Sequence, residues 1–260
     1  MLEKYQDELK IKMVPFKFMV FIPKSGKYKA IDDVVEGEEY KTLSGTELRQ
    51  LLDEGEGIPE WFTFKEVAHE LELSNPPLTK RGITIFFSGL SGSGKSTLAN
   101  GLLTKFLEEG SRPVTLLDGD IVRTHLSSEL GFSKEHRSLN IKRIGYVASE
   151  ITKNGGIAIC APIAPYEEDR KFNRELISNE GGYIEIFVST PLEKCEERDS
   201  KGLYALAREG KIKEFTGISD PYEEPKNAEI VINSSGESPE KLVEEIYEKI
   251  VSMGYVKKVT

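Results

Sequence analysis

The pattern of apolar and polar positions changes near residue 80 of the 260-residue chain. Downstream, short apolar runs, several of them apolar almost throughout, alternate with longer stretches of helical period. The runs that predict strands are Ile83–Phe87, Val114–Leu117, Ile157–Cys160, Tyr183–Val188 and Glu229–Ile232. The stretches that predict helices are Lys95–Glu109, Ile121–Leu130, Lys134–Lys153, Glu167–Asn179, Leu192–Asp199 and Pro239–Met253. Such alternation predicts βαβ crossovers, and therefore an α/β three-layer sandwich around a parallel sheet of about five strands.

The residues upstream of this alternation follow a different pattern. Ser44–Leu52 begins with Ser-Gly-Thr-Glu, which is typical of a helix with a capping box. Phe64–Leu73 predicts a second helix, and the proline- and glycine-containing residues 74–82 have the composition of a linker. We therefore expect a small α+β module over residues 1–78 and a larger domain over residues 79–260.

The charge balance of the chain argues against some classes of binding partner. The chain has 35 Lys and Arg against 44 Asp and Glu, a net charge of −9. Residues 1–78 contribute 10 basic and 16 acidic side chains, net −6, which leaves 25 and 28, net −3, for the remainder. Broad binding to nucleic acid or to an anionic membrane surface is therefore not expected, whereas a local basic pocket is compatible with this balance.

Nothing in the composition indicates secretion, a disulfide framework or a zinc site. The two cysteines, Cys160 and Cys195, are far apart, and so are the three histidines. Residues 1–10 are too charged for a signal peptide, and no segment approaches the ~20 apolar residues that a membrane-spanning helix requires. A cytoplasmic, reducing environment is the expected setting.

The strongest motif follows the first predicted strand of the larger domain. Nine residues match the G-x-x-x-x-G-K-[ST] phosphate loop: Gly89, Leu90, Ser91, Gly92, Ser93, Gly94, Lys95, Ser96 and Thr97. The glycines let the backbone N–H groups surround an anion, and the following helix adds its N-terminal dipole. We expect Lys95 to reach the β- and γ-phosphates of a nucleotide and the Ser96 hydroxyl to bind Mg²⁺.

A second motif, Asp118-Gly119-Asp120, ends the next predicted strand. In a doubly wound sheet, ligands bind at the carboxyl ends of the strands. Of the two acids, Asp118 and Asp120, one can support the metal ion while the other accepts a proton from an attacking hydroxyl. The guanine-specific sequence Asn-Lys-x-Asp is absent. The residues by themselves therefore predict an ATP-dependent phosphotransferase whose acceptor they leave open.

Several motifs in a fixed order resemble adenylylsulfate kinase, also called APS kinase. They are Phe86–Thr97, Leu117–Arg123, Leu130–Ser133, Arg137, Asn140, Arg143, Ala161–Tyr166, Lys201–Tyr204 and Phe215–Ile218. That family phosphorylates the 3′-hydroxyl of adenosine 5′-phosphosulfate (APS) with ATP. The resemblance covers nearly all of residues 79–260, and it implies a Mg²⁺-dependent kinase of the P-loop class.

The resemblance also implies roles for individual residues. Asp120 corresponds to the group beside the acceptor hydroxyl, and Lys95 to the cation that stabilises the transferring phosphoryl group. An aromatic pair, Phe132 and Phe215, corresponds to the rings that sandwich the APS adenine. The remaining contacts to APS that the resemblance implies are Arg123, Arg137, Asn140 and Ile163.

Residues 195–208 resemble the family's mobile lid, in which Arg198 and Lys201 face the ATP phosphates. Two departures from the family pattern stand out. Ala164 replaces a serine that some members phosphorylate, so direct transfer without a phosphoserine is expected. Ala205-Leu206 stands where members commonly carry lysine, so that charge must be absent or supplied from elsewhere.

Residues 1–78 resemble the C-terminal end of ATP sulfurylase, as found in fused sulfurylase–APS kinase chains. The motifs are Met19–Pro23, Ser44–Arg49 and Ile58–Phe62. A His-x-x-His pair is absent, so sulfurylase activity is not expected. The resemblance implies a homodimer and leaves association with a separate ATP sulfurylase open. The alternatives are another P-loop small-molecule kinase and a protein that chiefly docks on a sulfurylase.

Overall fold

The computed structural model describes residues 8, 10, 12, 14, 16–110 and 112–257. Most of the first ten residues, whose charge argued against a signal peptide, therefore lie outside the described residues. The chain divides into two compact units, Met1–Pro77 and Leu78–Thr260, and each is described by itself.

The larger unit is built on a five-stranded parallel sheet with the order β4-β5-β3-β6-β7. Its strands are β3 (Ile83–Ser88), β4 (Val114–Asp118), β5 (Ile157–Ala161), β6 (Gly182–Val188) and β7 (Ile230–Ile232). Every residue of β3, β5 and β6 is buried, as their almost continuous apolar sequences predict. The expected parallel sheet of about five strands is thus confirmed, and the phosphate-loop motif follows its central strand.

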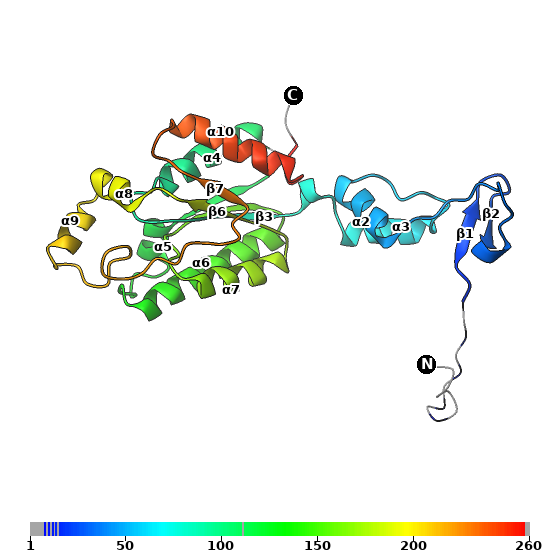
Figure 1. Ribbon diagram of the computed structural model, residues 1–260, viewed down its shortest axis with the longest axis horizontal. Coiled ribbons are helices and arrows are strands. Elements are labelled where there is room, and N and C mark those ends of the chain that lie inside the picture. The colour runs from blue at the N-terminus through cyan, green and yellow to red at the C-terminus, as the bar shows by residue number, and fades with distance from the viewer. Residues whose placement is uncertain are drawn as a thin grey trace. The chain divides into compact units, whose positions relative to one another are not determined.

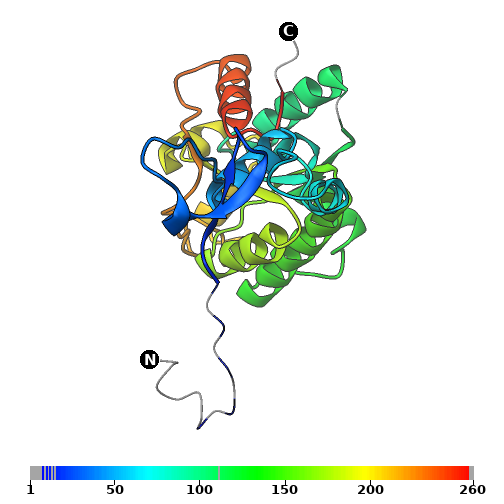
Figure 2. The ribbon, with the colours of Figure 1, turned by 90° about the vertical axis from the view of Figure 1, so that its right-hand side faces the viewer.

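Helices cover both faces of this sheet (Figures 1 and 2). On one face α4 (Lys95–Glu109) and α10 (Pro239–Ser252) pack on the strands, and their apolar side chains share one core cluster with them. On the other face α5 (Gly119–His125), α6 (Lys134–Lys153) and α7 (Glu167–Ser178) enclose a second cluster. The unit is therefore the predicted three-layer sandwich.

Two features of the larger unit differ from the pattern-based expectation. The helix expected over 121–130 is wrong at both ends, since α5 spans Gly119–His125. It begins early because the Asp118 carboxylate accepts a hydrogen bond from the Asp120 N–H at 3.0 Å and caps the helix. Beyond α8 (Leu192–Arg198), a further helix, α9 (Leu203–Arg208), was not predicted, because six residues carry too little periodicity.

The smaller unit contains an antiparallel pair of strands, β1 (Met19–Ile22) and β2 (Lys27–Ala30), followed by α2 (Gly45–Glu54) and α3 (Lys65–Ser74). The predicted capping box of α2 is confirmed: Ser44 and Glu47 exchange both of its hydrogen bonds. Short 3₁₀ turns lie at Ile31–Asp33 in this unit and at Leu78–Lys80 in the larger one. The smaller unit therefore has the α+β character expected of the N-terminal module.

In the described part of the chain, no helix has both the length and the apolar character needed to cross a membrane.

Candidate active site

A cavity of about 1020 Å³ lies at the carboxyl ends of the parallel strands. Of the residues singled out from the sequence, those that line it include Ser91, Gly92, Gly94, Lys95, Ser96, Thr97, Asp118, Gly119, Asp120, Arg123, Phe132, Arg137, Asn140, Ile163, Ala164, Arg198, Lys201 and Phe215. Gly89, Leu90 and Ser93 do not line it and instead belong to the loop's supporting backbone. The fold thus brings the residues of the phosphate loop and the residues expected to bind the acceptor to one cavity.

The cavity is basic although its domain is slightly acidic. Its cationic lining residues are Lys95, Arg123, Arg137, Arg198, Lys201, Lys211 and Lys213, and its acidic ones are Asp118, Asp120, Asp199 and Glu237. Cations that converge in a recess concentrate positive potential where a polyanion would sit. The acidic composition of the chain is therefore compatible with a site for phosphorylated ligands.

Two glycines of the phosphate loop are required by its backbone geometry. Gly92 and Gly94 have φ of +72° and +104°, in the region that favours glycine. A Cβ on Gly94 would come within 2.9 Å of the Ser234 hydroxyl. The loop therefore owes its closed shape to residues without side chains.

Lys95 lies at the start of α4 and is buried. Its ammonium donates a hydrogen bond to the Leu90 carbonyl at 2.7 Å, so it is held across the loop. Burial lowers the pKa of Lys95 to about 8, an effect that the nearby Cys195 and Asp118 oppose. A partly desolvated cation in this place gains most from an anionic ligand.

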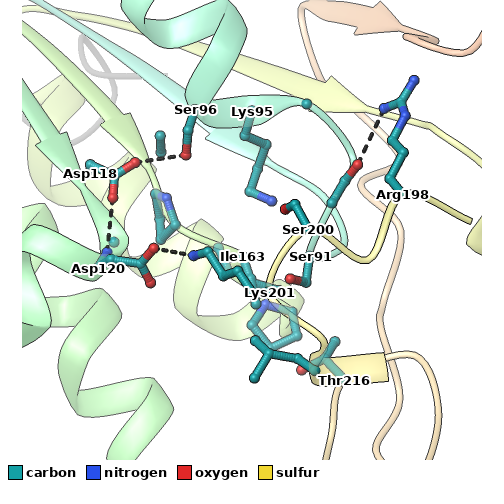
Figure 3. A pocket seen from close by; sticks show the side chains of 18 of the residues that line it. Ser91, Lys95, Ser96, Asp118, Asp120, Ile163, Arg198, Ser200, Lys201 and Thr216 are labelled. Carbon is teal, nitrogen blue, oxygen red and sulfur yellow. Dashed lines mark hydrogen bonds and ion pairs between the residues drawn. The ribbon is translucent and has the colours of Figure 1, made fainter. Parts of the chain in front are cut away.

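Polar side chains form a continuous series from the loop to the lid (Figure 3). The Ser96 hydroxyl donates to Asp118 Oδ2 at 2.7 Å, and the other carboxylate oxygen of Asp118 accepts from the backbone N–H of Asp120. The Asp120 carboxylate in turn forms an ion pair with Lys201. The hydroxyl and the two carboxylates therefore lie together beside the phosphate loop.

The far side of the cavity is held by a buried arginine network. Arg137 donates to the Thr216 hydroxyl at 2.5 Å and to Asp220 Oδ2 at 2.9 Å, and the same carboxylate oxygen accepts from the Tyr166 hydroxyl at 2.6 Å. Burial and this hydrogen bond to Asp220 raise the pKa of Tyr166 to about 12. Asn140 is also buried, and its side-chain oxygen has no hydrogen-bond partner among the described residues.

The two expected aromatic residues come from separate elements. Phe132 is 62% exposed, and the Arg123 guanidinium lies 4.5 Å from the centre of its ring. Phe215 is half-buried and packs edge-to-face on Tyr204, with 5.0 Å between ring centres. Both rings border the cavity, so both have a face or edge available to a planar ligand.

The lid segment is anchored by residues that the sequence reasoning missed. Arg198 donates to the hydroxyl and carbonyl oxygens of Ser234 at 2.8 and 2.6 Å, and the Ser234 hydroxyl also donates to the Ser93 carbonyl at 2.6 Å. Thr190 donates to the same carbonyl at 2.9 Å. Thr190 and Ser234 follow the ends of β6 and β7, so the rule that ligands bind at strand ends could have found them. Asp220 offered no such local signal.

Comparison with known proteins decides the family. The family model of adenylylsulphate kinase matches residues 81–233, and the model of ATP-sulfurylase matches residues 1–73. The chain belongs to the adenylylsulphate kinase family. It carries in addition a segment of the ATP-sulfurylase family.

Two solved structures support this assignment. A hexameric APS kinase from Thiobacillus denitrificans is 41% identical, with a TM-score of 0.78, and the match covers 98% of this chain and 46% of that one. The APS kinase of Mycobacterium tuberculosis, solved with AMPPNP and APS, is 39% identical, with a TM-score of 0.63. That match covers 66% of this chain and 98% of the M. tuberculosis chain. The larger unit therefore has the fold of an APS kinase.

The curated relatives are longer. A sulfate adenylyltransferase from Aspergillus oryzae is 47% identical over 253 residues, 97% of this chain but 44% of the relative. One from Aspergillus terreus is 48% identical over 254 residues, again 44% of its length. The chain thus spans less than half the length of these relatives, and their names describe proteins with additional sequence.

Proposed function

We propose that the chain phosphorylates the 3′-hydroxyl of APS with ATP, giving 3′-phosphoadenosine 5′-phosphosulfate (PAPS) and ADP. One observation carries this proposal. A phosphate loop with a buried lysine shares a cavity with two aromatic rings, two arginines and a buried asparagine oxygen that lacks a partner. Such a set suits a nucleotide whose base stacks and whose sulfate and phosphate groups meet cations.

The donor side binds the ATP phosphates. The loop N–H groups and the start of α4 surround the phosphates, and Lys95 balances the charge that spreads over the transferring group. Arg198, held by Ser234, stands next to the loop. Together with Lys201 it provides the lid cations, and a closed lid excludes the water that would otherwise hydrolyse ATP.

The acceptor side binds APS. Arg123 and Arg137 face its phosphosulfate, Asn140 and Ile163 line the space beside the ribose, and Phe132 and Phe215 stack on the adenine. Asp120 takes the proton of the 3′-hydroxyl as this oxygen attacks the γ-phosphorus and the bond to the β-phosphate oxygen breaks. Lys201 forms an ion pair with Asp120, and this pair must open for the carboxylate to accept the proton of the hydroxyl.

The residues present fit a magnesium ion. Ser96 and Asp118 offer hard oxygen ligands, and their side chains already lie within one hydrogen bond, 2.7 Å. Among the described residues no group of three or more His, Cys, Asp or Glu side chains could hold a metal ion by itself. Mg²⁺ uses few protein ligands and completes its shell with phosphate and water. When bound, it neutralises charge on the β- and γ-phosphates.

Ala164 supports direct transfer. The residue is fully buried and has no hydroxyl, so this position offers no phosphate carrier. A single displacement at the γ-phosphorus between ATP and APS is therefore the route we propose.

A coupled ADP-release assay tests the function. We expect turnover with ATP, Mg²⁺ and APS, and none above background with gluconate, shikimate or a nucleoside as acceptor. The product should carry phosphate at the 3′ position, which phosphorus NMR or mass spectrometry distinguishes. Turnover with one of the other acceptors and not with APS would assign the chain to another small-molecule kinase. The homodimer and the association with an ATP sulfurylase stay predictions.

A further inference from the structure

A pocket-lining loop contains a strained residue. The loop that follows β5 contributes Pro162, Ile163, Ala164 and Pro165 to the cavity. Ala164 has φ of +47°, in the left-handed region that residues other than glycine rarely occupy. Something outside the loop must therefore hold this conformation.

The guanidinium of Arg170 is placed to do so. Arg170 lies in the first turns of α7, and only 3% of its surface is exposed. It donates to the Ala164 carbonyl at 2.7 Å. Its second terminal nitrogen donates to the Glu223 carbonyl, also at 2.7 Å, and its Nε lies 3.2 Å from Glu185 Oε1 on β6. The guanidinium thus donates hydrogen bonds to two carbonyls and forms an ion pair with one carboxylate, on three different segments.

The two carbonyls belong to the two loops that form the acceptor side. The first loop carries Ile163, whose carbonyl accepts from the Gly89 N–H at 3.2 Å. The second loop contains Glu223 three residues after Asp220, the residue that holds Arg137. The loops are also joined by a bond from the Glu223 N–H to the Pro165 carbonyl at 2.9 Å. One buried side chain that does not line the cavity therefore binds the backbone of both loops.

We propose that Arg170 is a positioning residue for APS: its guanidinium holds the loop of Ile163 and the loop of Asp220 at the spacing that the acceptor requires. The inference rests on the proposed function and deepens it. Arg170 itself touches neither the phosphate loop nor the lid in any recorded contact, and it is linked to the phosphate loop only indirectly, through the bond from the Gly89 N–H to the Ile163 carbonyl. We therefore expect its loss to act mainly on the acceptor and much less on ATP.

The same network offers a matched control. Arg174, one turn further along α7, donates to Glu185 Oε2 at 3.1 Å and makes two bonds to Glu229. It shares the carboxylate partner of Arg170 but has no recorded bond to either pocket loop. Arg170→Lys keeps the buried positive charge but removes the planar guanidinium that binds two carbonyls at once. Arg174→Lys makes the same chemical change at a residue that has no recorded bond to either loop.

The experiment compares the two lysine variants in the full chain. We expect Arg170→Lys to raise the KM for APS roughly tenfold or more, as a misplacement of about 1 Å would. Its KM for ATP should stay near the wild-type value, and Arg174→Lys should change neither. A rise in both Michaelis constants, or equal effects in the two variants, would reduce Arg170 to a general structural role and overturn the proposal.

Two further measurements keep the test decisive. Amide hydrogen exchange without substrate should speed up in residues 162–166 and 221–224 of Arg170→Lys alone. The exchange rates report whether Arg170 holds the two loops, and they do so whether or not the protein turns over APS. A wild type that does not turn over APS would overturn the proposed function instead. If Arg170→Lys does not fold, the double variant Arg170→Met/Glu185→Gln removes both charges of the pair, a change that buried pairs often tolerate. A normal KM for APS in that variant would contradict the proposal.

Discussion

The donor and acceptor sides of the cavity are built in different ways. On the donor side, nine consecutive residues form the loop, and Lys95 binds a carbonyl only five positions away in the sequence. On the acceptor side, Arg137 is held by residues 79 and 83 positions away, Thr216 and Asp220. The phosphate loop of the donor side therefore owes most of its shape to local backbone geometry, with distant support from Thr190 and Ser234 at the Ser93 carbonyl. The acceptor side instead depends on distant loops for its main contacts.

The difference predicts how each side fails. A change in the loop removes charge stabilisation that the transition state needs, so it lowers kcat. A change in the acceptor loops shifts whole groups of contacts and should raise the KM for APS while ATP still binds. The following changes separate the two sides, from the largest expected effect to the smallest.

Lys95→Ala should have the largest effect. Removing the buried ammonium takes away the cation closest to the transferring phosphoryl group, and we expect kcat to fall by roughly 10³-fold or more. The coupled ADP-release assay measures the loss. Lys105→Ala, on the same helix but in a surface pair with Glu244, is the control and should stay near wild type. APS binding measured by calorimetry should survive in Lys95→Ala, and its loss would show that the two sides are not separate.

Asp120→Asn comes next. General base catalysis contributes about 10²- to 10⁴-fold, so we expect kcat to fall by that amount while the KM for APS changes little. The asparagine keeps the size of the side chain and removes the proton acceptor. A variant with near wild-type kcat would remove Asp120 from the catalytic role and leave it as a partner of Lys201.

Phe132→Ala and Phe215→Ala test the acceptor side. Stacking of about 1–3 kcal/mol per ring corresponds to a rise in the KM for APS of roughly 5- to 150-fold, with the KM for ATP unchanged. Phe172→Ala is the control, because this exposed ring on α7 does not line the cavity. Unchanged acceptor affinity in both variants would favour another P-loop kinase.

The pH dependence of ATP binding should show a smaller effect. Burial lowers the pKa of Lys95 to about 8, so the substrate-free protein loses this positive charge as the pH rises through that value. ATP favours the charged form, and its affinity should therefore fall by about tenfold between pH 7 and pH 9. Lys95→Arg, whose guanidinium stays charged, should lack this dependence in calorimetric titrations. An affinity of the wild type that does not vary over the range would contradict the assignment.

Much of the fold could be predicted from the sequence, because its signals are local. The buried strands are runs of apolar residues, and helix α6 begins and ends at the residues that its pattern predicted. Where the signal was weak, the prediction failed. Helix α5 begins at a cap made by Asp118, and α9 is too short to show a period.

The candidate site divides in the same way. The phosphate loop and the Asp118-Gly119-Asp120 turn could be predicted because each is a short motif that follows a strand. The bond of Arg137 to Asp220, the anchoring of Arg198 by Ser234 and the ion pair of Lys201 with Asp120 could not. Each joins residues more than 30 positions apart, and nothing near either partner indicates the other.

By itself, the sequence determined that this protein is a P-loop α/β domain behind an acidic α+β module, with an anion-binding loop at a known place. Only the tertiary structure decided how the acceptor side is held, through a buried arginine on α7 that binds the carbonyls of two loops. The physical reason is that a loop of consecutive residues encodes its own geometry. A contact between distant side chains forms only after the sheet has positioned its helices. Every residue has a backbone carbonyl, so the residue types do not indicate which carbonyls Arg170 binds.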